Sequence, residues 1–313
     1  MLPLVIVNPA SAGGATGGEW PGVAADLRAQ FGPFACAFTE GPGDGRAIAE
    51  REARSGRRFV IACGGDGTIS EVAAGLLAAG ADAELGVLPS GTGGDFRRTL
   101  DIPARTRDAA LALRRGKTAR IDAGRVTFTP AVVAGGEGGA EVLRRSDVAE
   151  ASRYFVNVAS FGMGGAVIER VKSSRSSWLP SGPSRLFGGR ASFAAAALRT
   201  AVTFEKPTVA VRLDDGPEAR LTVANLCVAN ARYFGGGMKI APEAKLDDGR
   251  FDVVAVGDLS AAEILLNSYR VYLGTHLGLR EVRHARAQKV TLRAVSGGAD
   301  ARLEVDGELS GRL

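Results

Sequence analysis

Hydrophobic and polar positions follow two different spacings along the first 120 residues of the chain. Short apolar runs of four or five residues are typical of buried strands, and apolar residues that recur every three or four positions indicate one face of a helix. The predicted strands are residues 4–7, 34–38, 59–63 and 85–88, and the predicted helices are residues 23–31, 45–55, 69–79 and 106–115. Strands separated by helices predict a parallel, doubly wound sheet, so we expect an α/β domain over residues 1–122.

Beyond Asp122 the pattern changes from alternating strands and helices to hairpins. The predicted strands are residues 209–213, 221–229, 251–256, 289–294 and 301–305, and the predicted helices are residues 192–202 and 261–273. Asp-Gly turns, which favour antiparallel hairpins, follow residues 213 and 305. We therefore expect a second, mostly antiparallel domain over residues 123–313, with a flexible insertion at the Gly- and Glu-rich, then charged, residues 132–151.

The strand predicted at residues 59–63 is followed by Gly64-Gly65-Asp66-Gly67-Thr68 and then by a helix. This order presents backbone N–H groups and a helix N-terminus to a phosphate, and the glycines allow the backbone to approach it closely. Phosphates repel a carboxylate, so a carboxylate in a phosphate loop needs a bound cation or a role in proton transfer to explain its presence. Asp66 therefore indicates a metal–nucleotide complex. An ordinary strand-to-helix turn is the alternative, because Gly and Asp are common turn residues.

Three predicted parallel strands end in polar, Gly-rich or Pro-bearing loops, at residues 8–14, 64–68 and 89–96. Ligands of doubly wound sheets bind beyond the carboxyl ends of the strands. Because these three loops follow strand ends of one sheet, together they support a nucleotide site more strongly than any of them does alone.

Composition narrows the class of protein. Hydrophobic residues make up 45% and charged residues 23% of the chain, which is typical of a globular protein. The net charge of +5 is compatible with nucleotides or an anionic membrane surface, whereas sparse aromatics without interleaved basic runs argue against nucleic-acid binding. Three widely spaced cysteines argue against a disulfide framework or zinc site and favour a reducing, cytoplasmic location.

Several familiar sequence features are missing. The opening apolar run is too short for a signal peptide, and no run of about 18 apolar residues predicts a transmembrane helix. The chain also lacks the P-loop motif, the nucleophile elbow of α/β-hydrolases and the H-E-x-x-H zinc motif. With only two histidines, His276 and His284, histidine-based catalysis is a poor expectation, and we expect both to be structural or surface residues.

Four motifs together resemble the diacylglycerol kinase catalytic family, which includes the bacterial soluble lipid kinases and the sphingosine kinases. In order along the chain they are Asn8-Pro9-Ala10-Ser11-Ala12, Gly64-Gly65-Asp66-Gly67-Thr68, Pro89-Ser90-Gly91-Thr92 and Val305-Asp306-Gly307-Glu308. The second motif alone is shared with NAD kinases, but the combination is more specific. The likeness extends over nearly the whole chain.

The resemblance implies an ATP-dependent lipid kinase, with ATP between an α/β domain and a β-sandwich domain. By this likeness, Mg²⁺-ATP contacts fall on Asn8, Pro9, Ala10, Ser11, Ala12, Thr39, Gly64, Gly65, Asp66, Gly67, Thr68, Glu71 and Thr92. The family's carboxylate network corresponds to Asp66, Asp95 and Asp122, and its catalytic base to Glu308, with Asp306 beside it. The residues alone leave open which of these last two carboxylates acts.

The resemblance also implies a magnesium-binding turn at Lys245, Asp248 and Arg250. Lys245 and Arg250 can serve there only through backbone carbonyls, because cationic side chains are not metal ligands. For Asp248 a plain turn role is the alternative.

The chain departs from the family at one position. The family usually has Asn-Asp-Phe where this chain has Gly94-Asp95-Phe96. The amide is lost and the carboxylate is kept, so a water in place of the amide, weakened activity and a different acceptor are all open.

We expect a cytoplasmic, peripherally membrane-associated kinase that phosphorylates a lipid alcohol, with diacylglycerol as the favoured acceptor. Basic residues mixed with Trp178, Leu179 and Phe187 over residues 170–190 suit contact with an anionic membrane, although a solvated linker is the alternative. A kinase of a sphingoid, another lipid or a polyol, and a nucleotide-binding protein with weak catalysis, are the other interpretations. The pattern indicates no particular oligomeric state, and a homodimer stays open.

Overall fold

The computed structural model describes residues 1–91, 93–128, 151–166, 200, 203–296 and 302–312. The chain divides into two compact units. Unit 1 comprises Met1–Gly124, Tyr154–Val158 and Asn230–Gly249, and unit 2 comprises Arg125–Arg153, Ala159–Ala229 and Arg250–Leu313. The predicted insertion at residues 132–151, the helix at 192–202 and the basic stretch at 170–190 lie wholly or almost wholly outside the described residues.

A four-stranded parallel sheet forms the centre of unit 1. Its strands are β1 (Leu4–Val7), β2 (Ala35–Phe38), β3 (Phe59–Gly64) and β4 (Glu84–Pro89), in the order β2-β1-β3-β4. Their in-register pairing aligns Val7 with Cys63, and Cys63 in turn with Leu88. As a result β1, β3 and β4 end at one edge of the sheet, where the three polar loops begin.

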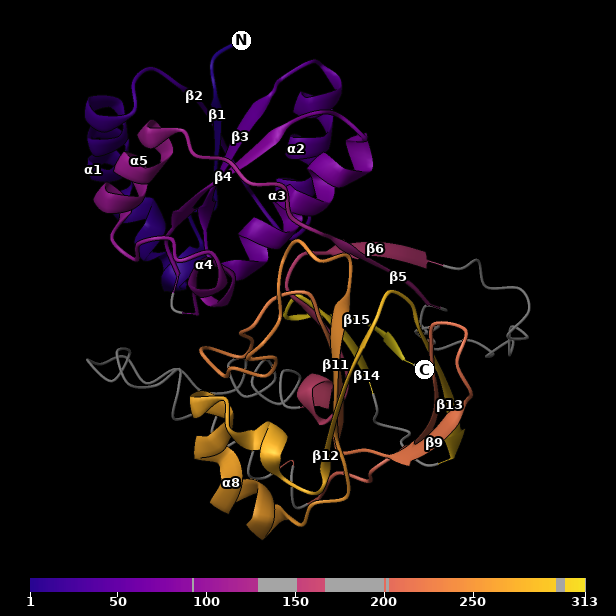
Figure 1. Ribbon diagram of the computed structural model, residues 1–313. Coiled ribbons are helices and arrows are strands. Elements are labelled where there is room, and N and C mark those ends of the chain that lie inside the picture. The colour runs from indigo at the N-terminus through magenta and orange to yellow at the C-terminus, as the bar shows by residue number, and fades with distance from the viewer. Residues whose placement is uncertain (92, 129–150, 167–199, 201–202, 297–301, 313) are drawn as a thin grey trace, which may run out of the picture. The chain divides into compact units, whose positions relative to one another are not determined.

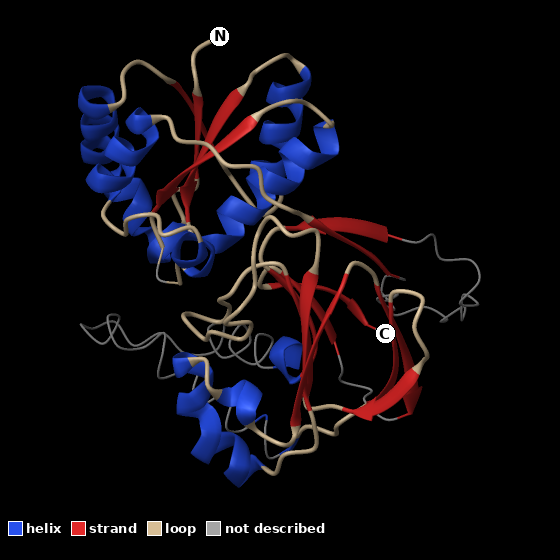
Figure 2. Ribbon diagram, in the orientation of Figure 1, coloured by secondary structure: helices blue, strands red, loops and turns tan. Residues whose placement is uncertain are grey.

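Helices cover both faces of this sheet (Figures 1 and 2). The four helices are α1 (Ala15–Gln30), α2 (Asp44–Arg54), α3 (Asp66–Ala79) and α5 (Thr106–Arg115). Successive strand side chains point to opposite faces, so Ile6 packs in the core with α2 and α3, whereas Val7 packs in the core with α1 and α5. This is the doubly wound arrangement that the alternating sequence pattern predicts.

Two later segments of the chain complete unit 1. Val156 and Ala231 are buried in the same core cluster as α2 and α3. Asn230, which is fully buried, donates through Nδ2 to the backbone oxygens of Asp122 and Val156 at 2.8 and 2.9 Å. The N-terminal unit is therefore assembled from three separate stretches of sequence.

Unit 2 contains two larger antiparallel sheets. The first has the order β12-β11-β10-β7-β14-β15, and the second has the order β13-β8-β9. The strands are β7 (Val158–Gly162), β8 (Thr208–Leu213), β9 (Ala219–Thr222), β10 (Asn225–Ala229), β11 (Phe251–Val256), β12 (Val282–Ala287), β13 (Val290–Ser296), β14 (Arg302–Val305) and β15 (Glu308–Arg312). Side chains from both sheets, including Val211 and Val253, form one buried cluster, as in a β-sandwich.

Four further elements are two paired strands and two helices. Strands β5 (Gly124–Phe128) and β6 (Ala151–Phe155) pair with each other. Helix α4 (Asp95–Thr99) is a single short turn after β4, and helix α8 (Ala261–Leu273) follows β11. None of the helices in the described ranges is long and apolar enough to cross a bilayer.

The structure corrects one predicted strand. Residues 221–229, predicted as one strand, form the end of β9 and all of β10, which belong to different sheets. The division lies at Val223 and Ala224, whose N–H groups donate to Pro207 O and Val256 O. Adjacent N–H groups thus have partners in different segments, so the chain changes sheets here.

Candidate functional site

The predicted phosphate loop lies between β3 and α3. Gly64 ends β3, Gly65 precedes α3, and Asp66 is the first residue of the helix. A Cβ atom on Gly64 would lie 2.4 Å from Thr68 Oγ1, closer than real Cβ contacts, so only glycine fits there. The loop thus places backbone N–H groups at the N-terminus of a 14-residue helix, as an anion site requires.

The loop after β1 joins this site through side chains. Asn8 Nδ2 donates to Thr68 Oγ1 at 3.0 Å, and Ser11 Oγ accepts from Gly65 N at 3.4 Å. Asn8 Oδ1 also accepts from Ala10 N at 3.0 Å, which closes the turn that contains Pro9. The structure therefore brings together two motifs that lie more than 50 positions apart in sequence.

The glycine loop after β4 crosses the loop after β3 at close range. Ser90 N donates to Gly64 O at 2.8 Å, which extends the parallel pairing by one bond. A Cβ atom on Gly91 would lie only 2.6 Å from the Cα atom of Gly65. The absence of a side chain at Gly91 is therefore what allows the two loops to touch.

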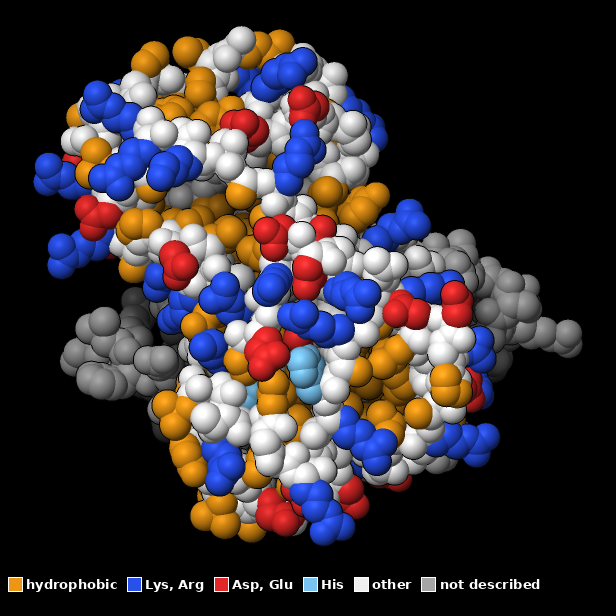
Figure 3. Space-filling model, in the orientation of Figure 1, with side chains coloured by type: hydrophobic (Ala, Val, Ile, Leu, Met, Phe, Trp, Pro, Cys, Tyr) orange, Lys and Arg blue, Asp and Glu red, His pale blue; other side chains and the backbone are white. Residues whose placement is uncertain are grey.

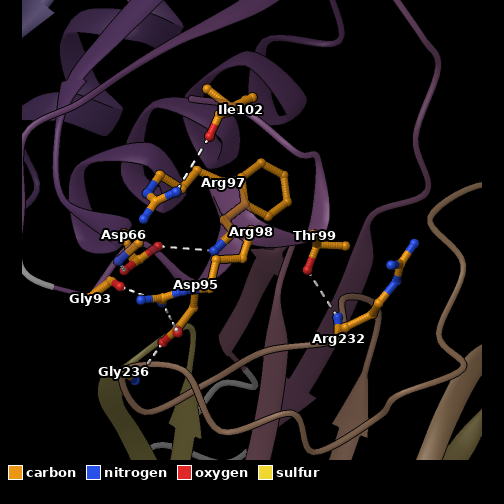
Figure 4. A network of polar contacts seen from close by, with 11 residues as sticks. Asp66, Gly93, Asp95, Arg97, Arg98, Thr99, Ile102, Arg232 and Gly236 are labelled. Carbon is orange, nitrogen blue, oxygen red and sulfur yellow. Dashed lines mark hydrogen bonds and ion pairs between the residues drawn. The ribbon is translucent and has the colours of Figure 1, made fainter. Parts of the chain in front are cut away.

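Asp66 fastens these loops together. Its Oδ2 accepts from Gly94 N at 2.7 Å, and its Oδ1 accepts from Phe96 N at 3.1 Å (Figure 4). Both donors lie at the start of α4, where N–H groups lack helical partners and favour a carboxylate. Asp66 thus stabilises the start of α4, a role that the sequence did not indicate, in addition to any role in binding a ligand.

Asp95, the first residue of α4, is 6% exposed. Its Oδ2 accepts from Gly236 N at 2.7 Å and its Oδ1 accepts from Arg98 Nη1 at 3.1 Å. Burial raises the pKa of the Asp95 carboxyl, the nearby Asp66 carboxylate raises it further, and the N–H of Gly236 and the charge of Arg98 oppose both effects. The negative charge of Asp66 therefore adds to the effect of burial on the Asp95 carboxyl.

Gly94 has left-handed backbone angles, with φ 67° and ψ 37°, a region that glycine and asparagine tolerate best. A Cβ atom at this position would lie 2.6 Å from Arg97 Nε, 3.3 Å from its Cδ and 3.3 Å from its Cζ. The guanidinium side of Arg97 thus occupies the space that a side chain at position 94 would enter. Figure 4 shows Arg97 on the same side of α4 as Asp66.

The other predicted nucleotide residues lie around this centre with different contacts. Glu71 accepts from Gly43 N at 2.8 Å and from Gly45 N at 2.9 Å, so it stabilises the N-terminus of α2. Thr39 is buried after β2, Gly67 is exposed, and Ala12 has a positive φ of 54°. Thr92 lies outside the described residues. Within the described part of the chain, neither Thr39 nor Glu71 forms a hydrogen bond with the Asp66 carboxylate.

The predicted metal turn is tied to Asp122. Gly249 N, at a residue with φ 68°, donates to Asp122 Oδ2 at 2.7 Å. Lys245 and Asp248 belong to unit 1, whereas Arg250 begins a segment of unit 2. Among the described residues, no three His, Cys, Asp or Glu side chains are grouped so that they could hold a metal ion. A cation at this turn would therefore need backbone carbonyl oxygens in addition to carboxylates such as that of Asp248.

The C-terminal motif forms a tight hairpin in unit 2. Asp306 and Gly307 join β14 to β15 with φ values of 49° and 87°, as in a type I′ turn. Asp306 is 9% exposed, whereas Glu308 begins β15 and pairs with Arg153 Nη2 through Oε2 at 2.8 Å. The turn directs the two carboxylates differently, which separates their environments.

Sequence reasoning missed three partners of the site, namely Gly236, Arg98 and Arg153. A signal for Gly236 exists in the chain, since Gly235-Gly236-Gly237 is a run of three glycines, all with positive φ between 61° and 111°. Nothing in the sequence pattern indicates the two arginines, because each acts through a contact that only the folded chain creates.

Comparison with known proteins gives a consistent result. Residues 3–126 match the family described as "Diacylglycerol kinase catalytic domain", and residues 158–313 match "YegS C-terminal NAD kinase beta sandwich-like domain". A diacylglycerol kinase of Staphylococcus epidermidis is 28% identical over 278 residues, which cover 88% of this chain and 75% of that protein. A diacylglycerol kinase of Staphylococcus saprophyticus is 28% identical over 276 residues, which cover 88% of this chain and 78% of that protein. A crystal structure of a diacylglycerol kinase from Bacillus anthracis shares the fold, with a TM-score of 0.63 and 19% identity over 97% of this chain and 89% of that one.

Proposed function

We propose that this chain, which belongs to the diacylglycerol kinase catalytic family, is an ATP-dependent kinase that phosphorylates the hydroxyl group of a lipid alcohol, with diacylglycerol as the favoured acceptor. Family membership makes it a phosphotransferase, and the lipid acceptor is the further step that we propose. The observation that supports it most is the pair of touching glycine loops at the carboxyl ends of β3 and β4, fastened by Asp66.

Phosphoryl transfer requires positioning and charge neutralisation more than covalent assistance. The backbone N–H group of Gly67 at the start of α3 suits a phosphate of ATP, whereas that of Gly65 donates to Ser11 Oγ and helps to fix the loop. Because the loops contact each other directly, a change in one displaces the other. This rigidity is what a preorganised phosphate site needs.

The donor set at Asp66 fits a magnesium ion bound to the nucleotide. Each of its oxygens accepts one backbone N–H, and a carboxylate oxygen has a second acceptor position that a hard cation prefers. Mg²⁺, when bound, would neutralise charge that develops on the transferred phosphoryl group. Asp66 would hold this ion, and Asp95 would add a second carboxylate beside it.

For the acceptor hydroxyl, Glu308 is the proposed general base. Its side chain is 36% exposed and therefore reachable from solvent, whereas Asp306 is nearly buried in the turn. A positioned base of this kind contributes about 10²- to 10⁴-fold to the rate. The exposure favours Glu308 over Asp306 for a substrate that must enter and leave.

The turn at Lys245 and Asp248 is proposed to hold a structural cation. Asp248→Ala should then lower the thermal stability, and EDTA should destabilise the wild type but hardly affect this variant. Thermal unfolding with and without EDTA measures both effects. Equal sensitivity of the two proteins to EDTA would leave Asp248 as a turn residue only.

We further propose a cytoplasmic location with peripheral contact to the membrane surface, and helix α8 supports the membrane contact. Its exposed apolar side chains are Leu265, Leu266, Tyr269, Tyr272 and Leu273, and hydrophobic side chains gather over this helix in Figure 3. Leucines beside tyrosines are typical of helices that lie in a membrane interface, and a lipid kinase has to reach an acceptor dissolved in the bilayer. Leu266→Asp should therefore weaken sedimentation with phosphatidylglycerol vesicles, whereas Leu77→Asp on α3 should not.

The proposed function is tested by ADP release with a panel of lipid alcohols: diacylglycerol, a sphingoid base, a monoacylglycerol and glycerol. Turnover that requires diacylglycerol supports the proposal, and turnover with another member of the panel reassigns the acceptor. ATP binding without turnover on any acceptor would support a nucleotide-binding protein with weak catalysis. Gly94, with Arg97 in the adjacent space, is the observation that favours this second candidate.

A further inference from the structure

Glu308 is held by an arginine 155 positions earlier in the chain. Arg153 lies on β6, and its Nη2 donates to Glu308 Oε2 at 2.8 Å while its Nη1 donates to Ser310 Oγ at 2.6 Å. Residues 308 and 310 are two positions apart on β15 and therefore share one face of the strand. The planar guanidinium thus contacts β15 at two adjacent points, which fixes its orientation.

Ser310 completes a closed ring of contacts. Its hydroxyl donates to Glu308 O at 3.2 Å and accepts from Arg153 Nη1. The hydroxyl has one proton to donate and lone pairs to accept, so the two contacts are compatible. The ring therefore sets both the backbone of Glu308 and one oxygen of its side chain.

This ion pair is better suited to orientation than to stability. The side chains of Arg153 and Glu308 are 34% and 36% exposed, and ion pairs this open to solvent add little to folding stability. Within the described part of the chain, Glu308 Oε1 accepts no hydrogen bond. One carboxylate oxygen is therefore held and the other is open.

We propose that Arg153 is the positioning residue for Glu308, because it holds Oε2 and leaves Oε1 for the proton of the acceptor hydroxyl. This inference rests on the proposed function, in which Glu308 takes that proton. A glutamate side chain in water samples several rotamers, and loss of this freedom before the reaction increases the fraction of productive orientations. The positioning role requires the fork of an arginine rather than positive charge alone.

A double-mutant cycle tests this role. Arg153→Gln should lower kcat for lipid phosphorylation by about 10- to 100-fold, within the range that a general base contributes, and should leave the KM for ATP nearly unchanged. In a Glu308→Gln background the same change should lower kcat by less than about twofold, since the residue that Arg153 positions is already lost. Equal losses in both backgrounds would overturn the proposal and leave Arg153 with a general structural role.

Three further variants separate positioning from charge and from folding. Arg153→Lys keeps the charge without the fork and should recover only a minor part of the lost kcat. Ser310→Ala removes one point of the ring and should lower kcat by less than Arg153→Gln does. Arg125→Gln, on the paired strand β5, is the matched control and should leave kcat unchanged, because Arg125 is exposed and forms no hydrogen bond or ion pair with Glu308 in the described part of the chain. Full recovery in Arg153→Lys would overturn the role of the fork.

A second measurement does not depend on activity. Modification of Glu308 by a water-soluble carbodiimide and glycine amide, quantified by peptide mass spectrometry, should increase several-fold in Arg153→Gln and not in Arg125→Gln. If the wild type phosphorylates no acceptor, the proposed function fails while this labelling still tests the hold on Glu308. Unchanged labelling in Arg153→Gln, in protein with the wild-type melting temperature, would overturn the inference.

Discussion

At the scale of single residues, Asp66 combines two requirements in one side chain. It is the carboxylate of the proposed phosphate loop, and it also accepts two N–H groups at the start of α4. The glycine-rich loop and the resemblance to kinases both predict the first role, and only the fold reveals the second. A substitution there is therefore expected to affect both the ligand and the arrangement of the loops.

Asp66→Ala should reduce turnover to less than about a tenth of the wild-type value, since loss of a tenfold factor needs only 1.4 kcal/mol. It should also lower stability by about 1–3 kcal/mol, because Gly94 N and Phe96 N lose a charged acceptor. Steady-state ADP release and urea unfolding measure the two effects. Activity above that level would remove Asp66 from the proposed site, whatever the stability shows.

Asp95 makes stability depend on pH in a defined direction. Its folded-state pKa is raised above the ordinary value of 3.8, so the folded chain binds this proton more tightly than the unfolded chain does. The Asp95 carboxyl therefore contributes favourably to folding stability below pH 3.8, and this contribution is lost as the pH rises from 3.8 through the raised pKa. In that window the melting temperature of Asp95→Asn should rise relative to the wild type. A difference that stays constant from about pH 4 to 7 would contradict the buried charge.

Gly94→Asn restores the residue pair that is usual in the family. The left-handed angles suit asparagine, but its Cβ would contact Arg97 Nε, at the movable end of that side chain. Gly94→Asn alone should therefore cost little stability, and kcat should rise if the missing amide limits activity. Gly94→Asn with Arg97→Ala provides the control in which the space is free. An increase in kcat only in the double variant would identify Arg97 as the obstacle.

At the scale of elements, two glycine loops are interdependent because their backbones touch. Gly91→Ala should separate them, since its Cβ would lie 2.6 Å from Gly65 Cα, and backbone cannot move aside as a side chain does. ATP affinity should fall at least about tenfold, which corresponds to one 1.4 kcal/mol step. Gly18→Ala is the matched control, because Gly18 lies in α1 with open space around it. This variant should increase the free energy of unfolding by about 0.5–1 kcal/mol. Calorimetric titration with ATP and thermal unfolding distinguish the two outcomes.

Elements with local signals are those that the sequence predicts well. Helix α8 begins after Ser260, whose capping box with Glu263 is complete, and ends at Gly274 with a left-handed backbone, as predicted for residues 261–273. The prediction of one strand over residues 221–229 is wrong, because the two halves pair with different neighbouring strands. The local sequence does not specify which strands pair. For the same reason no motif in the sequence indicates the contacts of Asp95 with Gly236 and of Glu308 with Arg153.

At the scale of the whole molecule, the match to the catalytic-domain family ends at residue 126, but the compact unit does not. A fragment of residues 1–126 lacks the N–H of Gly236 for Asp95, the N–H of Gly249 for Asp122 and the buried Ala231. This fragment should unfold at lower urea concentration than unit 1 does within the full chain. Asn230→Ala in the full chain should also destabilise, by about 1–3 kcal/mol, because it leaves buried carbonyl groups without a donor. A fragment as stable as the full chain would show that the later segments are dispensable.

All residues of unit 1 are present only after residue 249 has been translated. Between residues 124 and 249 the ribosome adds 125 residues, which at about 5–20 residues per second takes roughly 6–25 s. During this interval Asp95 has no N–H from Gly236, and the core around Ile69 and Val72 lacks Ala231. Most of unit 2 is translated in the same interval and itself needs the residues after Arg250. The nascent chain therefore passes through a stage in which neither unit is finished, and both reach their final contacts late in translation rather than one after the other.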